Sequence, residues 1–69
     1  MQELIFIVEE DVEGGYTARA LGEAIFTQGD TVEELKEMIK DAIDCHFDSH
    51  EAKPKLIRLH FVKDEVFAI

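Results

Sequence analysis

The sequence predicts an α+β domain with element order β-β-β-α-β-β. We expect a three-stranded antiparallel meander, one helix packed on one sheet face, and then one or two C-terminal strands. Three observations lead to this prediction: a short apolar run near the start, glycine-containing turns between the next two segments, and a longer segment with apolar residues three and four positions apart. Sixty-nine residues are enough for one small domain, so residues 1–69 are treated as a single unit.

The first strand is predicted at residues 3–10, ELIFIVEE, because this run is rich in Ile, Val and Phe. Alternation along the strand places Leu4, Phe6 and Val8 on one face and two isoleucines on the other. Apolar residues on both faces are typical of a central strand.

Two further strands follow, each after a glycine turn. Gly14 and Gly15 predict the first turn, and the alternating segment YTARAL, residues 16–21, predicts the second strand. Gly22 predicts the next turn, and AIFTQ, residues 24–28, predicts a short third strand. Because these glycines are explained as turn residues, no phosphate-binding loop is expected.

The helix is predicted to begin after Gly29. Asp30 or Thr31 can act as the N-cap, with Glu33 or Glu34 as the partner in a capping box. Residues at helical spacing then form one apolar stripe, which we expect to face the sheet. Its members are Val32, Leu35, Ile39, Ala42, Ile43 and His46.

Beyond the helix, a polar segment ends at Pro54, and KLIRLHFV, residues 55–62, predicts another strand. Asp64 and Glu65 separate it from VFAI, residues 66–69, which is expected to be a short hairpin partner. A single helix covers only one face of a sheet, so an apolar face is expected to remain open. Such a face favours self-association or binding of another protein.

With a net charge of −9 the chain is not expected to bind nucleic acid directly, because phosphate contacts need clustered Lys and Arg. An acidic surface instead attracts basic partners, although acidity also serves solubility alone. The candidate partner-binding residues lie at the end of the first hairpin and on the solvent face of the helix. They are Glu9, Glu10, Asp11, Glu13, Glu33, Glu34, Glu37 and Asp41.

No catalytic apparatus and no cofactor are expected. Cys45, His46 and His50 are metal-ligand types, but no second ligand pair with recognisable spacing accompanies them. His46 is expected to pack at the edge of the core instead. A single cysteine, with no export signal and no apolar run long enough for a membrane, favours a cytoplasmic protein.

Two segments together resemble a known family. VEEDVEGGYTARA, residues 8–20, followed by TQGDTVEELKEMIKDAI, residues 27–43, is similar to the N-terminal domain of HicB-like antitoxins. The resemblance implies a partial RNase H-like fold without catalytic carboxylates. It also implies that the domain binds and masks a small basic RNA-cleaving toxin of the HicA type, and that the protein is dimeric or larger.

The sequence also departs from that family. ALGEAIF, residues 20–26, stands where the family usually has a segment containing Pro-Gly. Full-length antitoxins carry a C-terminal DNA-binding module, for which these 69 residues hold no counterpart. The alternative to an antitoxin is therefore an orphan homo-oligomeric domain without a toxin partner.

Overall fold

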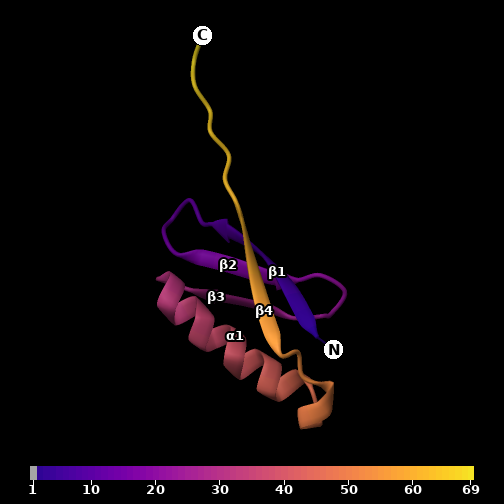
Figure 1. The fold of residues 1–69 in the computed structure, drawn as a ribbon. Coiled ribbons are helices and arrows are strands. Elements are labelled where there is room, and N and C mark those ends of the chain that lie inside the picture. The colour runs from indigo at the N-terminus through magenta and orange to yellow at the C-terminus, as the bar shows by residue number, and fades with distance from the viewer. Residues whose placement is uncertain (1) are drawn as a thin grey trace.

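The computed structural model describes residues 2–69 and confirms the α+β class (Figure 1). Four strands, one α-helix and a short 3-10 helix follow one another along the chain. They are β1 (Glu3–Glu10), β2 (Tyr16–Ala20), β3 (Phe26–Gly29), α1 (Val32–His46), η1 (His50–Ala52) and β4 (Leu56–Val62). The expected order of three strands, a helix and a further strand is confirmed.

The four strands form one mixed sheet in the order β3-β2-β1-β4. β1 to β3 are the predicted antiparallel meander, in which Val8 lies opposite Ala18 and Ala18 lies opposite Thr27. β4 pairs with β1 in parallel, since α1 carries the chain from one edge of the sheet back to the other. β1 is therefore an interior strand, as its apolar sequence predicts.

The core lies between α1 and one face of the sheet. Leu4, Phe6 and Val8 of β1 point into it, as the alternation predicts. From the predicted stripe of α1, Leu35, Ile39 and Ile43 are buried. Burial of side chains of this size stabilises a fold by about 1.5–3 kcal/mol each, so this single layer provides most of the apolar stabilisation.

The opposite face of the sheet has no second layer within residues 2–69, but it is less apolar than predicted. Ile5 and Ile7 are half-buried on this face, and Leu56 and Val62 of β4 share it. Arg58 interrupts the apolar surface and forms an ion pair with a carboxylate of β1. The open face is therefore mixed in character.

Two of the predicted strands are wrong, and the predictions 16–21 and 55–62 each extend one residue beyond the observed strands. The third strand is Phe26–Gly29 rather than residues 24–28, because Ala24 and Ile25 complete the turn, where the Ile25 amide bonds to the Glu23 carbonyl. Residues 66–69 do not form a hairpin strand. A two-residue hairpin loop requires residues that accept positive φ, usually Asn and Gly, and Asp64-Glu65 does not supply them.

The start of α1 is as predicted, with Thr31 as the N-cap. Its hydroxyl oxygen accepts a hydrogen bond from the Glu34 amide at 3.0 Å. The prediction for His46 is only partly correct. Its ring stacks edge-on against Phe47 with centroids 5.0 Å apart and lies 3.8 Å from the Glu23 carboxylate, but it stays exposed at the end of the helix instead of covering the sheet.

Candidate functional site

Two glycines bring the β1–β2 turn against the start of α1. Tyr16 of β2 pairs with Gly29 of β3, and Gly15 precedes that pair with φ +83°. A Cβ atom on Gly15 would lie 2.9 Å from the Gly29 carbonyl oxygen, and one on Gly29 would lie 2.7 Å from the Leu35 amide nitrogen. Only glycine allows these close approaches, so turn, strand and helix meet at one end of the molecule.

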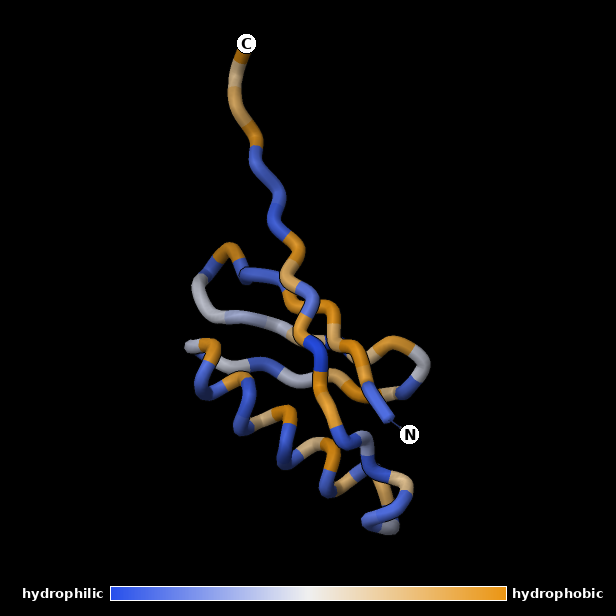
Figure 2. Tube along the Cα trace, viewed as in Figure 1, coloured by the Kyte–Doolittle hydropathy of each residue, from blue (hydrophilic) through white to orange (hydrophobic). Residues whose placement is uncertain are grey.

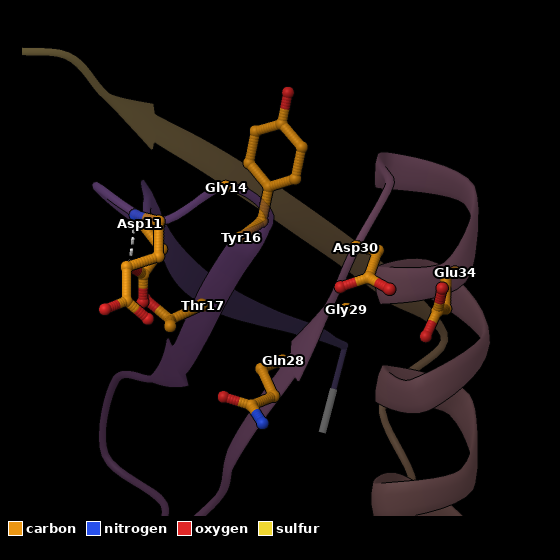
Figure 3. Close-up of a pocket in the computed structure, with 9 residues that line it drawn as sticks. Asp11, Gly14, Tyr16, Thr17, Gln28, Gly29, Asp30 and Glu34 are labelled. Carbon is orange, nitrogen blue, oxygen red and sulfur yellow. Dashed lines mark hydrogen bonds between the residues drawn. The ribbon is translucent and has the colours of Figure 1, made fainter.

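A pocket of about 370 Å³ lies where these segments meet (Figure 3). The β1–β2 turn contributes two carboxylates, and the residues flanking the start of α1 contribute two more. The lining residues are Asp11, Glu13, Gly14, Tyr16, Thr17, Gln28, Gly29, Asp30 and Glu34. Lys, Arg and His are absent from this lining, so the pocket is an acidic site with a tyrosine beside it.

Local hydrogen bonds fix some of these groups and leave others available. One Asp11 carboxylate oxygen accepts a bond from the Glu13 amide at 2.9 Å, which holds the turn. Thr31 caps α1, but the predicted capping box is incomplete, because within residues 2–69 the Thr31 amide donates no hydrogen bond to the Glu34 carboxylate. In Figure 3 the carboxylates of Asp30 and Glu34 lie next to each other at the helix start. They are therefore available to accept hydrogen bonds from a basic side chain.

The structure separates the predicted partner-binding residues into three groups. Asp11, Glu13 and Glu34 line the acidic pocket. Glu9 and Glu10 line a second depression, which shares Asp11 with the pocket and also contains Lys63 and Asp64. The remaining predicted residues lie on the exposed surface of α1, outside the pocket; they are Glu33, Glu37 and Asp41.

Glu37 differs from the other predicted residues because Lys40 lies 3.7 Å from its carboxylate, a separation of three residues along α1. The pairing partly neutralises this part of the helix. Of the candidate residues on α1, Glu34 is therefore the one we assign to the acidic pocket.

Four polar residues of the pocket were missed from the sequence. The sequence patterns indicate Asp30 only as a helix cap, Tyr16 and Thr17 only as strand residues, and Gln28 only as the end of the third strand. The glycine beside each of Tyr16 and Asp30 was the available signal, since glycine often marks a close backbone approach. Gln28 also lies next to Gly29, but nothing else in the sequence indicates that it belongs to a site.

The described residues contain no group of three or more His, Cys, Asp or Glu side chains arranged to hold a metal ion. Cys45 is exposed, and His46 and His50 lie in separate elements, α1 and η1. Within residues 2–69 there is also no helix with the length and apolar character needed to cross a membrane. The acidic pocket thus offers negative charge and hydrogen-bond acceptors, which suit a basic ligand.

Comparison with known proteins identifies the family. A UPF0150 protein of Thermotoga maritima is 52% identical over 68 residues, which cover 99% of this chain and 94% of that protein. The chain belongs to the UPF0150 family. A second UPF0150 protein, from Archaeoglobus fulgidus, is 62% identical over 53 residues, covering 77% of each chain. No family model and no solved structure matches this UPF0150 chain.

Proposed function

We propose that this UPF0150 chain is a protein-binding module of the HicB antitoxin type. It binds and masks a small basic RNA-cleaving toxin of the HicA type, in a cytoplasmic setting. The observation that supports this function is the acidic pocket, in which Asp11 and Glu13 of the turn meet Asp30 and Glu34 at the start of α1. The resemblance of residues 8–43 to HicB-like antitoxins names the class of partner.

Electrostatics favours a basic partner. The chain carries a net charge of −9, so its field accelerates encounter with a positively charged protein. Asp30 and Glu34 lie at the N-terminal end of α1, where the helix dipole stabilises negative charge. Their negative charge is complementary to Lys or Arg side chains of the partner.

Co-purification tests this function directly. Any small basic protein encoded in a neighbouring reading frame is co-expressed with the tagged chain, and the dissociation constant of the complex is then measured by calorimetry. We expect Asp30→Asn with Glu34→Gln to weaken binding at least about tenfold, because two carboxylates of the pocket lose their charge. Increasing salt is expected to weaken the wild-type complex.

The matched control is Asp48→Asn with Glu51→Gln. These exposed residues lie beyond the other end of α1, and their neutralisation changes the net charge by the same amount. Binding by this control should remain close to wild type. Equal losses in both double variants would assign binding to overall charge, and no complex with any neighbouring basic protein would contradict the antitoxin function.

A second candidate function is that of a homo-oligomeric domain without a toxin. It is favoured by the exposed apolar residues on the open sheet face, of which Phe26 is 65% exposed. In this case Phe26→Asp would abolish self-association measured by light scattering. Oligomers that persist in this variant would rule out the open face as the interface.

A further inference from the structure

The last seven residues extend away from the domain as a continuation of β4 (Figure 1). This segment makes the molecule 52 Å long, against 19 and 18 Å in the other two directions. Val66, Phe67 and Ile69 are 93%, 77% and 115% exposed. Figure 2 shows that a hydrophilic stretch precedes this hydrophobic end. Water is an unfavourable environment for such an apolar segment, so burial against another surface would stabilise it.

Segment 63–69 begins at the end of β4, a strand with one unpaired edge. β4 is the outer strand of the order β3-β2-β1-β4, so one edge of its backbone has no strand partner within residues 2–69. Exposed edges of this kind accept an additional strand. β4 and segment 63–69 are both seven residues long, so the segment can cover nearly all of that edge.

An apolar groove follows the same strand on the helix side. α1 packs over β2 and β3 and leaves a space of about 180 Å³ beside β4. Ile39 of α1 and Ile57 and Leu59 of β4 line this groove, flanked by Lys36 and Lys40. The groove thus combines an apolar floor with positive charge in an otherwise acidic molecule.

We propose that two copies of the chain exchange segment 63–69, each segment pairing antiparallel with β4 of the other copy. Alternation places Phe67 and Ile69 on one side of the segment. With Phe67 opposite Leu59 and Ile69 opposite Ile57, both apolar side chains cover the groove. The exchange is reciprocal about a two-fold axis, so it closes as a dimer in which the outer edge of β4 is paired in both copies.

Two features favour a second copy over the chain's own β4. Folding back would require a tight turn at Asp64-Glu65, which lacks the Gly or Asn that such turns need. Alternation also places Glu65 on the same side of the segment as Phe67, so exchange brings negative charge toward the side of the molecule on which Lys36 and Lys40 lie. In this register the two Lys63 residues meet at the axis, each diagonal to Glu65 of the other copy, which offsets their repulsion.

Sedimentation equilibrium of the full chain at micromolar concentration tests the exchange. We expect a wild-type dimer, and an increase of at least about tenfold in its dissociation constant for Phe67→Asp. Leu21→Asp is the matched control, because Leu21 is 46% exposed in the β2–β3 turn and lines neither the groove nor the start of segment 63–69. Phe67 lies beyond the last strand of the single copy, so the helix signal in the circular dichroism of its variant should stay unchanged.

A crosslink tests the register. In a Cys45→Ala background, Lys63→Cys should form a disulfide-linked dimer under mild oxidation, because directly opposed residues of antiparallel strands lie within disulfide reach. Leu21→Cys in the same background should not, because Leu21 lies in the β2–β3 turn, away from β4 and the segment. A monomeric wild type, a dimer that survives Phe67→Asp, or a dimer lost only with Phe26→Asp on the open sheet face would each overturn the exchange.

Discussion

At the residue scale, Gly29 decides how the acidic site is assembled. Its hydrogen atoms leave room for the Leu35 amide nitrogen, which would lie only 2.7 Å from a Cβ atom. The next nearest atoms, the Leu35 Cα and the Glu34 carbonyl carbon, also belong to the backbone. They cannot rotate away as the end of a flexible side chain would. The first turn of α1 therefore depends on this one position for its place beside the β1–β2 turn.

We expect Gly29→Ala to lower the free energy of unfolding by about 1–3 kcal/mol, the usual cost of overpacking a close contact. The measurement is urea denaturation followed by circular dichroism. Gln28→Ala at the neighbouring exposed position serves as the control and should change stability by less than about 0.5 kcal/mol. Equal stability of Gly29→Ala and wild type would show that the helix start moves freely.

The ion pair between Glu3 and Arg58 makes a prediction about pH. The Arg58 guanidinium donates two hydrogen bonds to the Glu3 carboxylate, at 2.7 and 3.2 Å, and lowers the pKa of Glu3 below its ordinary value of 4.5. Because the folded pKa is the lower one, the stabilisation is present above about pH 4.5 and is lost as the pH falls through the folded pKa.

Arg58→Ala should therefore raise the pKa of Glu3 toward 4.5 and reduce the pH dependence of stability in the acid range. An NMR titration of the Glu3 side chain measures this shift. Arg19→Ala removes another exposed arginine from the same sheet face and should leave the pKa of Glu3 unchanged. A titration curve unaffected by loss of Arg58 would contradict the ion pair.

At the element scale, local patterns determined most of what was predicted correctly. β1 spans the predicted residues 3–10, and α1 ends at His46, the last member of the predicted stripe. Alternation and helical spacing involve residues that are close along the chain, so both patterns can be recognised from the sequence alone. The parallel pairing of β4 with β1 and the meeting of the turn with the helix start depend on contacts between distant residues, which no local pattern reports.

The N-cap of α1 is one of these local signals and can be tested alone. Thr31→Ala removes the hydroxyl that accepts the Glu34 amide and should cost about 1 kcal/mol of stability, measured by thermal or urea unfolding. Thr31→Ser keeps the acceptor and should stay close to wild type. A cost that is the same for both variants would point to lost packing of the threonine methyl group.

At the scale of the whole molecule, charge and shape divide the surface into two regions. Carboxylates gather where the β1–β2 turn meets α1, whereas the apolar segment 63–69 extends from the end of β4. The sequence predicted an acidic partner surface but spread it over eight residues, because net charge says nothing about which carboxylates converge. Only three of those eight line the pocket, and Asp30 joins them.

Inhibition of RNA cleavage tests the antitoxin function most directly. The small basic protein from the neighbouring reading frame is assayed on RNA while the full chain is titrated into the reaction. We expect cleavage to stop at equimolar chain. Asp30→Asn with Glu34→Gln should require at least about tenfold more protein, and Asp48→Asn with Glu51→Gln should act like wild type. Cleavage that continues undiminished in excess wild-type chain would contradict the proposed function.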